Sequence, residues 1–167
     1  MKGKSVFYLD LFRKMDEHNV RYLLVGGLAM NLHGVPRMTM DVDIVLAMDT
    51  GNLDAFIAAA HELDIKPRLP VSIEQLKDAG IREEWATRRN MIAFSLGGDS
   101  FAVPTVDVLI RHPLDFEAAY ENALIREAGD VAIRYACIED MVKMKDGTGR
   151  RQDAADVEQL RRFGEEK

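Results

Sequence analysis

Residues 26–43 read GGLAMNLHGVPRMTMDVD, a stretch that combines two glycines with two closely spaced acids. The apolar run RYLLV precedes it and IVLA follows it, so we expect a strand over residues 21–26, a helix over 27–34 and a second strand over 41–47. Side chains of an extended chain alternate between two faces, which places Thr39, Asp41 and Asp43 on one face. The stretch therefore predicts two carboxylates close together after a paired-glycine turn.

Two neighbouring carboxylates in an otherwise apolar strand need a cationic partner, because each raises the pKa of the other. Hard cations such as Mg²⁺ prefer carboxylate oxygens, whereas zinc prefers histidine and cysteine ligands at set spacings. The histidines of the chain follow no such spacing; they are His18, His33, His61 and His112. The sequence therefore predicts magnesium rather than zinc.

A third acid, Asp107, lies in the apolar and β-branched run PTVDVLI, where a solvated aspartate is unusual. If this run forms a strand beside residues 41–47, Asp107 completes a three-carboxylate site with Asp41 and Asp43. Such a site holds two metal ions about 3.5–4 Å apart. Gly26 and Gly27 fit the same chemistry, because glycine lets the backbone approach phosphate closely. The combination predicts phosphoryl-transfer chemistry on a nucleotide.

The rest of the chain predicts a mixed β-sheet flanked by helices, an α+β fold. Further helices are expected over residues 5–18, 52–63, 72–89, 115–124, 138–145 and 151–163, and further strands over 65–69, 90–96, 101–110 and 131–135. Ser72 and Gln75 match a capping box, and GGDS predicts a hairpin turn between the strands at 90–96 and 101–110. We predict a core over residues 1–136 and a C-terminal helical segment over 137–167 packed on it.

Composition narrows the class of protein. The chain has 167 residues, 47% of them hydrophobic, which is enough for one ordinary core, and its formal charge of -6 argues against a broad nucleic-acid-binding surface. Cys137 is the only cysteine, so an intrachain disulfide is excluded, and a role as a small buried residue or at a helix end is expected. No apolar run has the length of a membrane span and the start lacks a signal-peptide pattern, so we expect a cytoplasmic protein without a membrane partner.

The glycine pair and the acids resemble the nucleotidyltransferase superfamily with the DNA polymerase β-type minimal fold. The residues that match its signature are Gly26, Gly27, Asp41, Asp43 and Asp107. More narrowly, two stretches look like the short bacterial nucleotidyltransferases akin to the AbiEii toxins of toxin–antitoxin systems. These are residues 26–44, with Gly34, Arg37 and Thr39, and residues 141–160, MVKMKDGTGRRQDAADVEQL.

The resemblance implies transfer of a nucleoside monophosphate from an NTP such as ATP to an acceptor hydroxyl, with Mg²⁺ required and pyrophosphate released. It implies that Asp41 and Asp43 bind both metal ions and that Asp107 helps to deprotonate the acceptor. From the residues themselves, Gly26 and Gly27 are expected at the β and γ phosphates.

Arg37 and Thr39 precede the acids. Arg37 is expected to neutralise phosphate charge or to pair with a surface acid. Thr39 is expected to hydrogen-bond a phosphate, to order Asp41 or to face water.

The end of the chain matches the closing helical motif of the family, in which a lysine reaches the triphosphate and an aspartate supports the site. The matching residues are Lys143, Lys145, Arg150 and Asp153. Lys143 is the preferred nucleotide-binding residue, because its helix is otherwise apolar. The alternative is that these charges simply coat a solvent-exposed helix.

The acceptor stays open among a transfer RNA, a protein and a small molecule, and a cognate antitoxin protein is a candidate partner. A second interpretation is a catalytically silent member of the fold that serves as a binding or antitoxin-like regulatory module.

Overall fold

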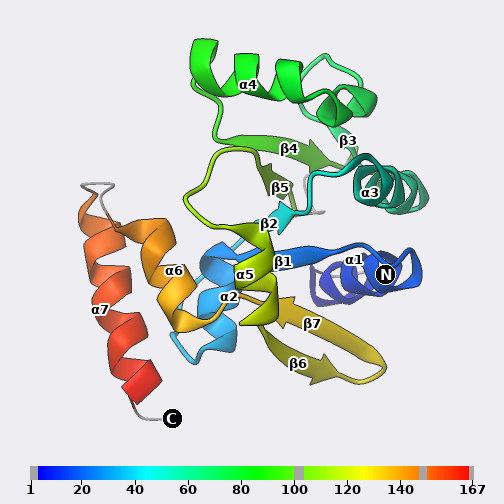
Figure 1. Ribbon diagram of the computed structural model, residues 1–167. Helices are drawn as coiled ribbons and strands as arrows, with labels where there is room; N and C mark the ends of the chain where they lie inside the picture. Colours follow the sequence, from blue (N-terminus) through cyan, green and yellow to red (C-terminus); the bar gives the residue numbers. More distant parts are fainter. Residues whose placement is uncertain (1–3, 100–103, 147–149, 166–167) are drawn as a thin grey trace.

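The computed structural model describes residues 4–99, 104–146 and 150–165, and within them one seven-stranded mixed sheet carries seven α-helices and one 3₁₀ helix (Figure 1). The helices are α1 (Lys4–Glu17), α2 (Gly26–Leu32), α3 (Thr50–Glu62), η1 (Ile73–Lys77), α4 (Ala79–Arg88), α5 (Phe116–Glu121), α6 (Ile138–Lys145) and α7 (Arg151–Glu165). The strands are β1 (Tyr22–Val25), β2 (Val42–Leu46), β3 (Lys66–Pro67), β4 (Ala93–Gly97), β5 (Val106–Leu109), β6 (Leu124–Ala128) and β7 (Val131–Tyr135). The expected α+β fold with C-terminal helices is confirmed.

The sheet has the strand order β3-β4-β5-β2-β1-β7-β6. At its centre β2 is antiparallel to β1 and parallel to β5, and β4 is antiparallel to β5. The central strands β1, β2 and β5 consist mostly of apolar residues, as is typical of interior strands that are covered on both faces. All of β1 is buried, and Leu23, Leu24, Ile44 and Val108 have no exposed surface. Each such side chain stabilises the fold by about 1.5–3 kcal/mol.

Helices lie on both sides of the sheet. In Figure 1, α6 and α7 lie side by side on the left of the view, near α2, and α1 and α3 lie together on the right. Met141 of α6 and Leu160 of α7 are buried in the same core cluster as the central strands. The division into residues 1–136 and 137–167 stays a prediction, and the shared core shows that the last two helices pack against the rest.

The expected helix over residues 72–89 divides in two. Ser72 is the N-cap, as expected, but of the 3₁₀ helix η1: its hydroxyl accepts from the backbone N–H of Glu74 at 3.2 Å. The N–H of Gln75 donates to the backbone oxygen of Ser72, so the bond from Gln75 to the Ser72 hydroxyl that a capping box requires is replaced. Asp78 then ends η1 and caps α4, accepting from the N–H of Ile81 at 3.0 Å. A second N-cap inside the segment starts a second helix in a new direction.

The expected helix over residues 115–124 ends early. α5 stops at Glu121, and Leu124 opens β6, a strand that the sequence did not predict. A two-residue turn at Gly129 and Asp130, with Gly129 at φ +65°, pairs β6 with β7 as a hairpin. The four exposed residues at the start of β6 lack the alternation that marks a strand in a sequence.

The strand expected over residues 101–110 begins at Val106, after Pro104. β4 and β5 are antiparallel neighbours, as a hairpin requires. Residues 100–103, which include the end of the expected GGDS turn, and the expected GTG break at 147–149 lie outside the described residues. No helix among those described has the length and apolar character needed to cross a membrane.

Candidate functional site

One row of residues crosses the middle of the sheet. Ser95 of β4 pairs with Asp107 of β5, Asp107 with Asp43 of β2, and Asp43 with Val25 of β1. Register partners on neighbouring strands point to the same face, so the two carboxyl groups lie side by side. The expectation that the strand of Asp107 lies beside residues 41–47 is confirmed.

The two carboxyl groups interact strongly. The pKa of Asp43 is raised from 3.8 to about 7, mainly by burial and also by the charge of Asp107, a hydrogen bond between the two carboxyl groups and the charge of Asp41, while the charge of Lys145 opposes the rise. Two carboxylates cannot both be ionised cheaply at this separation. The pair therefore holds a proton near neutral pH, in a position where a divalent cation would replace it.

Asp41 lies close enough to the pair of Asp43 and Asp107 for its charge to act on Asp43. It is exposed and directly precedes β2, so the strand begins one residue later than expected and does not include Thr39. The hydroxyl of Thr39 donates to the backbone oxygen of Asp41 at 3.2 Å, which fits the expectation that Thr39 orders Asp41. The described residues hold no group of three or more histidine, cysteine, aspartate or glutamate side chains placed to bind a metal ion. The three-carboxylate metal site stays a prediction, while Asp43 and Asp107 supply donors of the type that Mg²⁺ prefers.

The glycine pair is packed against these residues. Gly26 opens α2 with φ +73°, and a Cβ atom there would lie 2.1 Å from Oδ2 of Asp43. A Cβ atom on Gly27 would lie 2.9 Å from Oγ1 of Thr39 and 3.7 Å from Nε of Arg37. The segment before β2 therefore folds back over the glycines and brings Arg37 and Thr39 to them.

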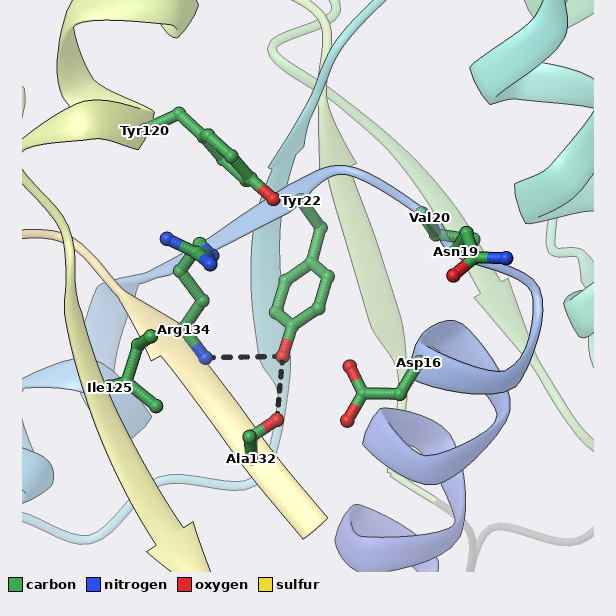
Figure 2. Close-up of a pocket in the computed structure, with 8 residues that line it drawn as sticks. All are labelled: Asp16, Asn19, Val20, Tyr22, Tyr120, Ile125, Ala132 and Arg134. Carbon is green, nitrogen blue, oxygen red and sulfur yellow. Dashed lines mark hydrogen bonds between the residues drawn. The ribbon is translucent and has the colours of Figure 1, made fainter.

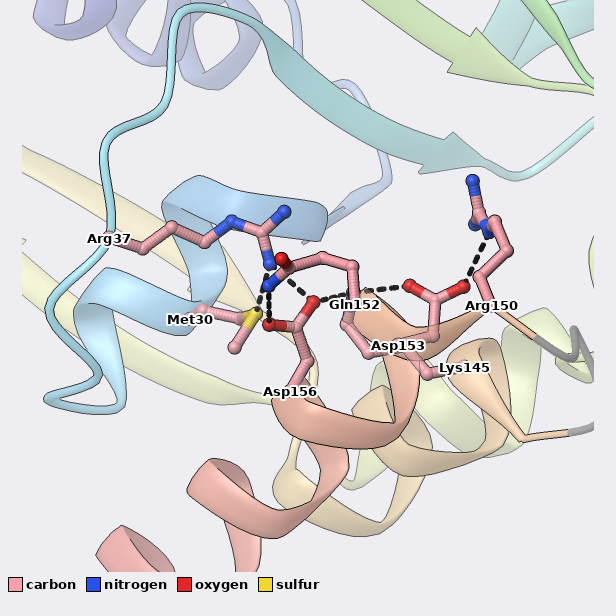
Figure 3. Close-up of polar contacts among 7 residues, drawn as sticks. All are labelled: Met30, Arg37, Lys145, Arg150, Gln152, Asp153 and Asp156. Atoms are coloured by element: carbon pink, nitrogen blue, oxygen red, sulfur yellow. Dashed lines mark hydrogen bonds and ion pairs between the residues drawn. The ribbon is translucent and has the colours of Figure 1, made fainter.

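A network of charges joins this segment to the C-terminal helices (Figure 3). Asp156 of α7 accepts hydrogen bonds from Arg37, from Lys145 at 2.9 Å and from Gln152 at 2.9 Å. Burial by itself raises the pKa of Asp156, but these hydrogen bonds outweigh it and hold the pKa below its ordinary value. Arg37 therefore pairs with a buried acid, where a surface acid was the sequence-based alternative.

Asp153 extends the network by one turn of α7. It lies 3.5 Å from Nζ of Lys145 and accepts from Nε of Arg150 at 2.7 Å. Both α7 aspartates are almost fully buried, which makes the cations around them important for stability. The acids of the last helix therefore hold Lys145, whose charge acts on Asp43, and Arg150, which lines the same cavity as Asp43.

Lys143 and Lys145 differ in their surroundings. The side chain of Lys143 is 65% exposed and lies 3.7 Å from Asp140, whereas that of Lys145 is 14% exposed. Lys145 is also the cation that lowers the pKa of Asp43. The apolar character of the helix favours Lys143 as the nucleotide-binding lysine in the sequence. The burial of Lys145 and its effect on Asp43 favour Lys145 instead.

A cavity of about 660 Å³ opens over Gly26 and Asp43. Its cations are Arg111, Lys143, Lys145 and Arg150, its acids are Asp43, Asp146 and Asp153, and its large apolar residues include Ile92, Leu109, Met141 and Met144. His112 also lines it, and burial lowers the pKa of this histidine. No sequence-based expectation placed Arg111 or Ile92 here. Ile92 directly precedes β4 and Arg111 follows the end of β5 by two residues, and a position at a strand end is the signal that could have found them. The cations of the lining suit a ligand with several negative charges, and its apolar side chains suit an apolar group on the same ligand.

The model of one protein family, described as "Nucleotidyltransferase of unknown function (DUF6036)", matches residues 8–162. The chain belongs to this family. The sequence-based expectation of a nucleotidyltransferase is thereby confirmed at the level of the family, and none of the curated proteins compared with the chain matches it in sequence.

Solved structures of three proteins resemble this member of the family. The lincosamide antibiotic adenylyltransferase LnuA, with lincomycin bound, has a TM-score of 0.62 at 13% identity, over 98% of this chain and 99% of that one. An antigenic nucleotidyltransferase-like protein from Paracoccidioides brasiliensis has a TM-score of 0.55 at 18% identity, over 93% and 73%. The antibiotic-resistance factor ANT(2'')-Ia has a TM-score of 0.53 at 12% identity, over 96% and 82%. At these identities the likeness establishes the fold.

His33 and Cys137 serve the structure of this nucleotidyltransferase-family chain. His33 is fully buried, with Nε2 2.7 Å from the backbone oxygen of Ala136 and its ring edge-on to Tyr135. Cys137 is the N-cap residue of α6 and its thiol donates to Asp140 at 3.4 Å. Burial raises the pKa of Cys137 to about 11, so the expected structural role at a helix end is confirmed.

A second, smaller cavity of about 260 Å³ lies around Tyr22 (Figure 2). Tyr22 faces away from Asp43, because Val25 is the β1 residue that pairs with Asp43 and side chains alternate. Its hydroxyl donates to the oxygen of Ala132 at 3.4 Å and accepts from the N–H of Arg134 at 3.1 Å. Both hydrogen bonds join β1 to β7, so Tyr22, the residue at the centre of this cavity, stabilises the pairing of these two strands.

Proposed function

We propose that this chain is a magnesium-dependent nucleotidyltransferase that moves a nucleoside monophosphate from an NTP to an acceptor hydroxyl. The observation that supports it most is the contact of two carboxyl groups, Asp43 and Asp107, of which Asp43 lies directly against Gly26 and lines a cavity rich in cations. Family membership supports the same reaction class.

The residues have separate roles in this proposal. Asp41, Asp43 and Asp107 would hold Mg²⁺, which would lower the pKa of the acceptor hydroxyl and screen phosphate charge. Gly26 and Gly27 leave space for the β and γ phosphates. The cations that line the cavity balance the triphosphate charge, above all the partly buried Lys145, with Lys143 as a further contact. Arg37, beside Gly27, is a further phosphate contact outside this lining, and Thr39 orders Asp41.

The bonds that change are those of an in-line displacement. The acceptor oxygen forms a bond to the α phosphorus, and the bond from that phosphorus to the bridging oxygen of the β phosphate breaks. The hydroxyl proton passes to Asp107, and pyrophosphate leaves with the electron pair of the broken bond.

The acceptor remains one of three classes: a small hydroxylated molecule, a transfer RNA end or a protein hydroxyl. The structural likeness to LnuA, an antibiotic adenylyltransferase, over nearly the full length of both chains makes a small molecule the first class to test. The resemblance to AbiEii-like toxins motivates the other two and a cognate antitoxin as partner, which co-purification tests.

The direct test of the reaction uses α-³²P-labelled NTPs, Mg²⁺ and a cell extract, followed by separation of RNA, protein and small molecules. Label in one fraction, with pyrophosphate release, identifies the acceptor class. The matched pair is Asp107→Asn, which we expect to abolish transfer, and Asp130→Asn, at an exposed residue of the β6–β7 turn, which we expect to leave it intact. Equal transfer by Asp107→Asn and wild type would contradict the proposal.

A second function is favoured by one observation, namely that the described part of the chain holds no group of three acids placed to bind a metal. In this second function the chain keeps the nucleotidyltransferase fold, has no catalytic activity and binds a protein partner. Pyrophosphate release by the isolated chain would exclude it.

A further inference from the structure

We propose that Ser95 is a positioning residue for Asp107, fixing one carboxylate oxygen so that the other is presented to Asp43 and to the metal ion. The inference rests on the proposed function and deepens it, because it assigns a supporting residue to the acid expected to receive the acceptor proton.

The geometry of the contact is specific. Oγ of Ser95 donates to Oδ1 of Asp107 at 2.5 Å, across register partners on β4 and β5. The pair is half-buried, and Asp107 touches Asp43 on its other side. Asp107 thus lies between a hydroxyl donor and a second carboxyl group.

The hydroxyl itself is held by the sheet. β4 lies between β3 and β5, and the backbone oxygen of Ser95 accepts from the N–H of Arg68 at 2.9 Å. Ladder bonds on both sides leave the strand little freedom, so the position of Oγ is set mainly by one side-chain torsion. A fixed donor of this kind can orient its acceptor.

Orientation matters for an aspartate because its terminal torsion is broad and lets the carboxylate rotate. A hydrogen bond from a hydroxyl to a carboxylate is short and strong, and it selects one rotation. With Oδ1 occupied, Asp107 offers its remaining oxygen to a cation. Groups that orient metal ligands in this way commonly change metal affinity or activity by about 10–100-fold when removed.

An ordinary strand serine is the alternative explanation, since cross-strand pairs with hydroxyl groups stabilise sheets by about 0.2–1 kcal/mol. That role affects the melting temperature and leaves metal affinity unchanged. The two roles therefore differ in what they change, and metal binding distinguishes them.

The experiment measures Mn²⁺ binding from the EPR signal of free Mn²⁺, in wild type, Ser95→Ala, Ser95→Thr and Ser95→Cys. We expect Ser95→Ala to weaken Mn²⁺ binding by about tenfold. Threonine keeps the donor and suits a half-buried strand, so Ser95→Thr should bind within about twofold of wild type. Cysteine keeps the volume with a weak donor and should lie near Ser95→Ala.

The matched control is Ser72→Ala, which removes the hydroxyl that caps η1. We expect it to lower the melting temperature without changing Mn²⁺ affinity. Wild-type affinity in both Ser95→Ala and Ser95→Cys would overturn the proposal, as would a Ser95→Thr variant as weak as Ser95→Ala.

A further readout separates this inference from the proposed function. If wild type binds neither Mn²⁺ nor NTP, the proposed function fails, and crystal structures of wild type and Ser95→Ala then decide the positioning role. A rotated Asp107 carboxylate in the variant supports it, and an unchanged carboxylate overturns it.

Discussion

Gly26 and Asp43 are in such close contact that a Cβ atom on Gly26 would lie 2.1 Å from Oδ2 of Asp43. Gly26 also has φ +73°, a conformation that other residues adopt only with strain. Two features therefore require glycine at position 26: the positive φ of the turn, and the Asp43 carboxylate that occupies the space of a Cβ atom. This contact couples the glycine turn to the carboxyl pair that the proposed reaction needs.

The variant Gly26→Ala tests this coupling. We expect it to lose magnesium-dependent NTP binding, because either the Asp43 carboxylate or the turn must move. Gly129→Ala is a matched control, since Gly129 has φ +65° and open space around its Cβ position. The control should cost about 1–2 kcal/mol from backbone strain alone and keep NTP binding. Calorimetry and thermal melts measure both, and equal behaviour of the two variants would show that the contact with Asp43 has no role.

The pKa of Asp43 predicts a pH-dependent stability in the absence of divalent metal. With the folded pKa raised from 3.8 to about 7, the stability from this group is complete below pH 4 and is lost as the pH rises to 7. Asp43→Asn should therefore match wild type at pH 4 and be more stable by about 2–4 kcal/mol at pH 8. Denaturant titrations in EDTA measure this, and a constant difference between pH 4 and 8 would contradict it.

The pair of Asp156 and Lys145 predicts a large effect on stability. Asp156 is 3% exposed, and Asp156→Asn leaves Lys145 and Arg37 without their shared carboxylate. We expect a loss of about 3 kcal/mol, against less than about 0.5 kcal/mol for Glu158→Gln on the exposed side of α7. Because the folded pKa of Asp156 is lowered, its contribution is present above pH 4 and is lost as the pH falls further. Equal denaturation midpoints for the two variants at pH 7 would disprove this role.

The two lysines of α6 give a prediction about nucleotide binding. Lys145→Gln should weaken binding of MgATP by about tenfold or more, because its partly buried charge lies beside Asp43. Lys143→Gln should change it by less than about threefold, since an exposed charge is screened by solvent. Fluorescence titration with a labelled ATP analogue measures both, and the reverse order would restore Lys143 as the main contact.

The parts of the fold that follow from local pattern could be predicted from the sequence. The apolar residues around Gly26, Gly27, Asp41 and Asp43 predict strand, turn, helix and strand, and β1, α2 and β2 follow that order. The place of Asp107 beside Asp43 could be inferred because an acid in a buried strand needs a partner.

Other features depend on tertiary contacts that a sequence does not display. β6 has four exposed residues, so its pairing with β7 leaves no alternating pattern to read. Nothing in the sequence around Ser95 distinguishes it from an ordinary strand serine, because its contact with Asp107 depends on the register between β4 and β5. The choice between Lys143 and Lys145 depends on α7, whose buried Asp153 and Asp156 select Lys145.

In the proposed site Asp43 and Asp107 bind a nucleotide through a divalent metal ion, and calorimetric titration of wild type and Asp43→Asn with ATP measures that binding. We expect binding to wild type in Mg²⁺, none in EDTA, and none to the variant under either condition. Binding of equal strength to wild type and Asp43→Asn, or binding that does not depend on Mg²⁺, would contradict it.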